Sequence, residues 1–120
     1  MEPVIEKYKF GAMRIAGETC EYDVLLRWDG KVRRRKSKLS RKVYGTSHKV
    51  SLDEAKQIYK KGAEVLIFGT GCFDKARLSD EAAAYFEKKG VRVMLAPTPE
   101  AIKHWNEARG KVIGLFHVTC

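Results

Sequence analysis

The alternation of apolar and polar positions divides the chain into a strand-rich first part and a second part in which helices and strands alternate. Residues 4–16 alternate loosely between glycines, which predicts a strand or hairpin. Residues 22–26 form another apolar run, and the Asp-Gly turn signal that follows favours a hairpin into residues 32–35. Residues 36–50 show no period and are predicted to form a loop.

The second part predicts three helices, each followed by a strand. The first helix begins at Ser51, which can cap it while Glu54 bonds back in a capping box, and Gly62 is its expected stop. Ser79 caps the second helix, and Thr98 caps the third, with a proline at its first position. The strands are expected at 65–68, 91–96 and 112–118. This alternation indicates an α/β fold with a mixed sheet.

The segment from Val65 to Gly71 is predicted to be an inner strand followed by a tight loop with a ligand-sized space at its carboxyl end. Gly69, Thr70 and Gly71 could form an anion-binding nest. The favoured alternative is a turn that permits close packing. A dinucleotide site would need a third glycine near Asp74 and an acid after the next strand, and a P-loop would need Gly-Lys-Ser/Thr, so no cofactor is expected.

Length and cysteine content bound the class of protein. At 120 residues the chain is expected to form one domain, residues 1–120. No apolar run approaches the roughly 18 residues of a membrane span, and no secretory signal is visible. Three widely spaced cysteines, Cys20, Cys72 and Cys120, fit reduced thiols better than a disulfide framework. We therefore expect a cytoplasmic protein without a membrane partner.

The positive charge is concentrated in one segment. The chain has 24 Lys and Arg against 15 Asp and Glu, a net charge of +9, and residues 30–52 contain no acid. The cations of this basic segment are Lys31, Arg33, Arg34, Arg35, Lys36, Lys38, Arg41, Lys42 and Lys49. Residues 33–42 could form a basic patch that attracts nucleic acid or another polyanion. A solvated, partly paired strand edge is the favoured alternative, because only Trp28 and Tyr44 flank the segment as stacking aromatics.

The loop Gly45–Lys49 combines groups that can bind an anion or move a proton. These groups are the hydroxyls of Thr46 and Ser47, the imidazole of His48 and the ammonium of Lys49. The alternative is that the hydroxyls satisfy loop backbone groups while His48 packs against a neighbour.

The remaining nucleophilic and ligating side chains depend on how the chain folds. His48 or His117 could pair with Cys72 or Cys120, as an acid/base or nucleophilic pair, although packing is the commoner role for such cysteines. His117 and Cys120 are three residues apart in an extended segment and point to opposite faces, so no metal site is expected. If the last strand runs parallel to the strand at 65–68, His117 and Cys120 share the end that bears Gly71.

Four stretches together resemble the adipogenesis-associated domain family. They are Phe-Gly-x-Met-x-Ile-x-Gly at 10–17, Gly-Thr-Ser-His-Lys at 45–49, the strand and glycines at 65–71, and Gly-Leu-Phe-His-Val-Thr-Cys at 114–120. The resemblance implies a three-layer α/β fold around a mixed sheet of about five strands, with an N-terminal hairpin region. The long basic segment suggests the archaeal branch. A diverged branch includes a mitochondrial assembly factor for respiratory complex I, and the family supplies no catalytic residue.

Three functions follow from these patterns. The favoured one is a small accessory or binding protein, by analogy an assembly helper, with a positively charged cleft between Gly69–Gly71 and Thr46–Lys49. The second is a nucleic-acid-associated protein that uses the basic segment. The third is a small enzyme with His48 or Cys72 as acid/base or nucleophile.

Overall fold

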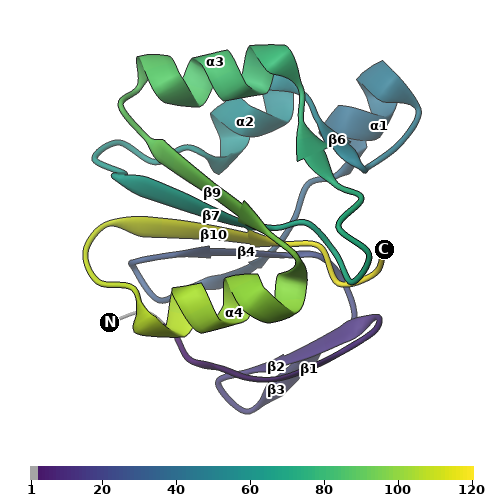
Figure 1. The fold of residues 1–120 in the computed structure, drawn as a ribbon, viewed down its shortest axis with the longest axis vertical. Helices are drawn as coiled ribbons and strands as arrows, with labels where there is room; N and C mark the ends of the chain where they lie inside the picture. The colour runs from purple at the N-terminus through teal and green to yellow at the C-terminus, as the bar shows by residue number, and fades with distance from the viewer. Residues whose placement is uncertain (1–2) are drawn as a thin grey trace.

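The computed structural model describes residues 3–120, which form ten strands and four helices (Figure 1). The strands are β1 (Ile5–Lys9), β2 (Ala12–Ile15), β3 (Glu18–Cys20), β4 (Val24–Arg27), β5 (Val32–Arg34), β6 (Lys49–Val50), β7 (Val65–Gly69), β8 (Arg77–Leu78), β9 (Arg92–Ala96) and β10 (Val112–Phe116). The helices are α1 (Lys38–Tyr44), α2 (Leu52–Ile58), α3 (Asp80–Lys88) and α4 (Thr98–Glu107).

A mixed five-stranded sheet in the order β5-β4-β10-β7-β9 forms the middle layer. β10, β7 and β9 are mutually parallel, whereas β4 and β5 are antiparallel additions. Helices α2 and α3 cover one face, and α4 lies on the other beside a second sheet, β1-β2-β3 (Figure 1). The predicted α/β fold with a mixed sheet is confirmed, and β7 is an inner strand as expected.

The core divides into two clusters, one on each face of this sheet. On the first face α2 and α3 bury Ile58 and Phe86 against Leu66 and Phe68. On the second face Trp105 of α4 packs with inward-facing residues of β1 and β2. The N-terminal strands therefore serve as a cover for half of the central sheet.

The segment 36–50, predicted to be a loop, contains the short helix α1 and the strand β6. Helix α1 ends at Tyr44 and is capped by Gly45, whose φ of 72° is the left-handed conformation that glycine adopts readily. Its buried residue is Ser40, and Leu39 is only half-buried. The loop prediction was wrong because a polar residue occupies the buried position, so no apolar period marks the helix.

The helix caps are confirmed at two of three predicted positions. Ser51 and Ser79 each accept a hydrogen bond from the backbone amide three residues on. Thr98 is the first residue of α4 and makes no capping bond of that kind. Helix α2 ends at Ile58, before the predicted stop at Gly62.

Among residues 3–120, none of the helices combines the length and the apolar composition needed to cross a bilayer.

Candidate functional site

The carboxyl ends of β7 and β10 lie side by side, because these two strands are parallel and adjacent. The amide of His117 donates to the carbonyl of Gly69 at 2.9 Å, and the amide of Cys72 donates to the carbonyl of Thr119 at 2.7 Å. The glycine loop and the segment 117–120 therefore share one end of the sheet, the arrangement that a parallel last strand predicts.

Four charged or titratable side chains form a network, the Asp23 network, that runs from this end of the sheet into the interior. His117 Nδ1 lies 2.7 Å from Asp23 Oδ2, and Arg35 Nη1 donates to the same oxygen at 2.9 Å. Arg35 also donates to both oxygens of Glu54, at 2.6 Å and 3.0 Å. Arg35 is 4% exposed, His117 3% and Glu54 0%. A guanidinium held on two sides by carboxylates provides charge compensation that buried ions require.

Serine hydroxyls and backbone groups form hydrogen bonds at the inner end of the Asp23 network. Ser40 donates to Glu54 and accepts from the amide of Ser51 at 2.9 Å. Arg35 donates its remaining Nη2 hydrogen bond to the carbonyl of Ser47 at 2.7 Å. The Asp23 network thus connects the loop after β5 to α1, α2 and the loop that contains Ser47.

The charges in the Asp23 network shift the pKa values of neighbouring groups in the same network. Burial acts to raise the pKa of Asp23, but hydrogen bonding to His117, the His117 charge, the Val118 amide and Arg35 together hold that pKa below its usual value. Burial acts to lower the pKa of Arg35, but the hydrogen bonds and charges of Glu54 and Asp23 raise it above its usual value. Both shifts favour the ionised forms and therefore the ion pairs.

The contacts of the Asp23 network correct two sequence predictions. Arg35 was grouped with the surface basic patch, yet its guanidinium is buried between carboxylates and contributes no exposed charge. Glu54 was expected to bond back to Ser51 in a capping box. Ser51 does accept the amide of Glu54 at 3.1 Å, but the Glu54 carboxylate binds Arg35 instead.

At the outer end, two histidines and a thiol lie together. The His48 ring meets the His117 ring edge-on at a centroid distance of 5.2 Å, and His48 Nε2 is 3.8 Å from Cys120 Sγ. Thr119 Oγ1 lies 3.2 Å from His117 Nε2. Of the thiol–imidazole pairs considered from the sequence, Cys120 with His48 is the one that the fold brings to contact distance.

Cys72 is exposed and lies beside Tyr8. The phenol of Tyr8 donates to the carbonyl of Val118 at 3.2 Å. Burial, followed by the charge and hydrogen bond of Cys72, raises the pKa of Tyr8 to about 12.

This shift predicts a tyrosine that titrates late. Because the folded-state pKa of Tyr8 lies above the ordinary value of 10, its stabilising contribution is complete below pH 10 and disappears as the pH rises through about 12. A titration followed by tyrosinate absorbance should show a phase near pH 12 that Tyr8→Phe removes. Tyr44→Phe is the control and should leave the late phase in place. A phase near pH 12 that survives Tyr8→Phe would contradict the assignment.

The glycine loop is built for close packing. The amides of Thr70, Gly71 and Cys72 donate to Ala96 O, Thr98 Oγ1 and Thr119 O at 2.9, 2.9 and 2.7 Å. These three amides are therefore already paired within the protein. Gly71 has a φ of +99°, and a Cβ there would lie 2.5 Å from the Cys120 carbonyl group. The structure gives Gly71 the packing role that was the favoured alternative to an anion-binding nest.

The loop 45–49 also has internal partners for most of its groups. Thr46 Oγ1 accepts from the amide of His48 at 3.1 Å, and the carbonyl of Ser47 accepts from Arg35. The carbonyl of His48 accepts from the amide of Arg77 at 2.7 Å, which joins this loop to the segment after the glycines. Lys49 Nζ lies 4.6 Å from the centre of the Tyr44 ring. The loop 45–49 and the glycine loop therefore both contact the segment 117–120.

The rest of the basic segment lies on the surface. Arg33 pairs with Asp29 at 3.5 Å, and Arg34 lies over the Tyr22 ring at 5.2 Å. Around α1, the exposed side chains of Lys36, Lys38, Arg41 and Lys42 have no carboxylate at ion-pair distance among the described residues. The predicted basic patch is thus divided into a buried arginine, a paired strand edge and a group of unpaired cations around α1.

Sequence reasoning missed Asp23 and the true role of Glu54. Asp23 is the second residue of the segment 22–26, and a single acid next to buried strand residues was the available signal. Among residues 3–120, no group of three or more His, Cys, Asp and Glu side chains is arranged to hold a metal ion.

Comparison with known proteins places the chain among small proteins without an assigned activity. A family model described as "Protein of unknown function (DUF498/DUF598)" matches residues 5–117. The conserved hypothetical protein PH1505 from the archaeon Pyrococcus horikoshii is 31% identical, covers 97% of this chain and 98% of its own, and superposes with a TM-score of 0.90. A structure named MT938 is 28% identical over 98% and 99% of the two chains, with a TM-score of 0.83. Protein XCC1710 of Xanthomonas campestris, at 14% identity and a TM-score of 0.75, shares the fold.

Proposed function

Because the chain belongs to the DUF498/DUF598 family, whose description assigns no activity, we propose a function from the geometry of this chain: a small cytoplasmic accessory protein that binds an acidic protein partner. The binding surface is the α1 surface, defined as the unpaired cations Lys36, Lys38, Arg41 and Lys42 together with Val43. An assembly-helper role is the form of this function that the sequence resemblance favours.

The observation that supports this proposal is the concentration of unpaired cations on one short helix. Lys38, Arg41 and Lys42 are at positions i, i+3 and i+4, so they lie on neighbouring parts of one helix face. Like charges at this spacing destabilise an isolated helix by a few tenths of a kcal/mol. An acidic partner would remove that repulsion and gain favourable electrostatic steering.

The aromatic rings near the α1 surface favour a protein over single-stranded nucleic acid. Nucleic-acid grooves use free aromatic faces on which bases stack. Here Tyr22, Tyr44 and Trp28 each have a cation over the ring, at 5.2, 4.6 and 5.2 Å. Val43 is 55% exposed between these cations and offers an apolar contact of the kind found in protein interfaces.

The proposal predicts loss of a partner when the charge of α1 is reversed. The triple variant Lys38→Glu/Arg41→Glu/Lys42→Glu should retain at least tenfold less of an acidic protein from source lysate than the unmodified chain, because three exposed pairs of about 0.5 kcal/mol each amount to about a factor of ten. The control Lys61→Glu/Lys88→Glu/Lys103→Glu makes the same change in net charge on other exposed positions and should retain the partner.

Two results would contradict this function. Equal loss by the control triple variant would mean that net charge alone attracts the captured protein. Loss of the captured material after nuclease treatment would favour the nucleic-acid hypothesis instead. The third hypothesis, a small enzyme, stays a prediction, and the 3.8 Å contact between Cys120 and His48 makes Cys120 its preferred thiol in place of Cys72.

A further inference from the structure

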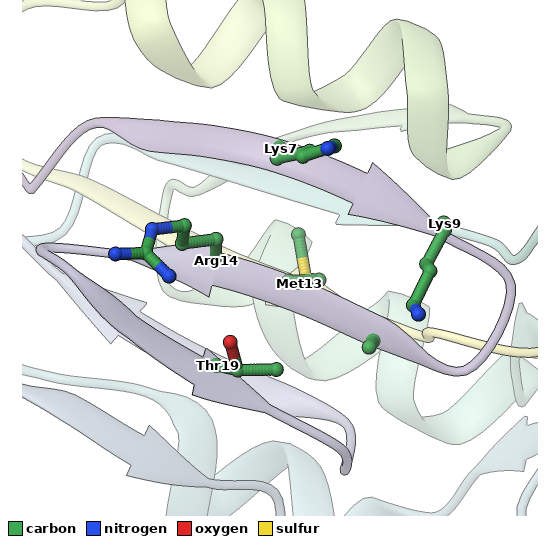
Figure 2. A pocket seen from close by; sticks show the side chains of 6 residues that line it. Lys7, Lys9, Met13, Arg14 and Thr19 are labelled. Carbon is green, nitrogen blue, oxygen red and sulfur yellow. The ribbon is translucent and has the colours of Figure 1, made fainter.

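A hollow of about 460 Å³ lies on the sheet β1-β2-β3 (Figure 2). This sheet lies away from helix α1 (Figure 1). Its lining residues are Lys7, Lys9, Ala12, Met13, Arg14 and Thr19. Figure 2 shows the three cations extending from neighbouring strands around this hollow. Its volume lies in the range of small-molecule sites, about 300–1,000 Å³.

The strand register places these cations on one face. Lys7 is paired with Arg14, and Arg14 is paired with Thr19 on the next strand. Lys9 lies opposite the small residue Ala12. Directly paired residues on neighbouring strands have side chains on the same side of the sheet, with Cβ atoms about 5 Å apart. Lys7 and Arg14 are therefore two like charges held opposite each other, an arrangement that destabilises an empty sheet.

The acidic groups nearby do not neutralise this face. Glu6 Oε1 lies 3.7 Å from Arg14 Nε, but the same oxygen accepts the amide of Gly17 at 2.8 Å. Arg14 and Glu6 are both about half exposed, so their ion pair is weak. Within residues 3–120 neither Lys7 nor Lys9 has a carboxylate at ion-pair distance. The hollow is thus left with an excess of positive charge.

We propose that this hollow binds the phosphate group of a small organic phosphomonoester. The planar guanidinium of Arg14 fits two phosphate oxygens, the ammonium groups of Lys7 and Lys9 balance the second negative charge, and the Thr19 hydroxyl can donate to the remaining oxygen. A phosphate group alone would occupy only part of 460 Å³. The organic group would lie over Ala12, which shares this face, whereas the side chain of Met13 faces the core.

Titrations with inorganic phosphate and phenyl phosphate at constant ionic strength test this site. Phenyl phosphate should cause saturable shifts of backbone amide resonances in residues 7–19 and bind more tightly than inorganic phosphate. Arg14→Gln should weaken its binding about tenfold, since a charge-assisted bond contributes on the order of one factor of ten. The control Lys88→Gln, which removes an exposed charge on α3 across the molecule, should leave the affinity unchanged (Figure 1).

Three outcomes would overturn the proposal. Shifts confined to α1 would place the anion on the other basic surface. Equal weakening by Lys88→Gln would reduce the effect to net charge. Equal affinities for phosphate and phenyl phosphate would remove the organic group from the site. Arg14 is exposed, so its replacement should not unfold the protein, and Thr19→Val offers a second, uncharged test within the same hollow.

Discussion

Glu54→Gln is expected to lower the free energy of unfolding by about 3 kcal/mol or more, because removing one partner of a buried ion pair leaves an uncompensated charge. Glu54 is fully buried, and its carboxylate accepts two hydrogen bonds from Arg35 and one from Ser40. Glutamine has nearly the same size, so the substitution changes charge and hydrogen bonding rather than volume. Urea denaturation followed by circular dichroism measures the effect.

Asp53→Asn is the matched control for this change. Asp53 is adjacent to Glu54 in α2, but its side chain is exposed, so its loss should alter the free energy of unfolding by about 0.5 kcal/mol at most. A double variant, Arg35→Met/Glu54→Gln, should lose less stability than the sum of the two single variants, since both members of the ion pair are then uncharged. Additive losses, or a loss from Glu54→Gln no larger than that of the control, would show that the buried pair does not stabilise the fold.

Gly71→Ala is expected to lower the free energy of unfolding by about 3 kcal/mol, from two causes. The backbone conformation at φ +99° is strained for a residue with a side chain, which costs about 1–2 kcal/mol. The added Cβ would also lie 2.5 Å from the carbonyl group of Cys120 and 2.9 Å from His117 Cδ2, and such overpacking costs about 1–3 kcal/mol. The same methyl group should displace the segment 117–120 from the glycine loop.

Gly90→Ala separates these two causes. Gly90 has a φ of +75°, but a Cβ there would have no atom within 4 Å, so only the backbone strain should be observed. Thermal or urea denaturation of both variants measures the difference, and amide resonances of residues 117–120 should move only in Gly71→Ala. Equal losses from the two glycines would mean that the contact of Gly71 with Cys120 is unimportant for stability.

The local pattern of the chain was sufficient for most of the fold. Apolar runs bounded by glycines marked the central strands, and Ser51 and Ser79 marked helix starts. These features depend on neighbours within a few residues, so a local pattern can report them. Helix α1 was missed for the converse reason, since its buried residue is Ser40, which is stabilised by contacts with residues 11 and 14 positions further on.

The candidate site could be predicted only in part. His48, His117 and Gly71 were recognised as groups that could meet, and the parallel pairing of β7 and β10 brings them together. Asp23 was not recognised as the partner of His117, nor Glu54 as the partner of Arg35, because these pairs are 94 and 19 residues apart in the sequence. An ion pair over such separations leaves no periodic signal.

The sequence by itself determined the α/β class, the inner strand 65–68 and the location of the excess charge, because periodicity, capping residues and composition are properties of short segments. Tertiary structure alone decided which charges are buried. Three consecutive arginines, residues 33–35, look alike in the sequence, yet Arg33 pairs with Asp29, Arg34 lies over Tyr22, and Arg35 is enclosed between Asp23 and Glu54. Side chains alternate along an extended segment, so the direction of each arginine depends on what the fold places beside it.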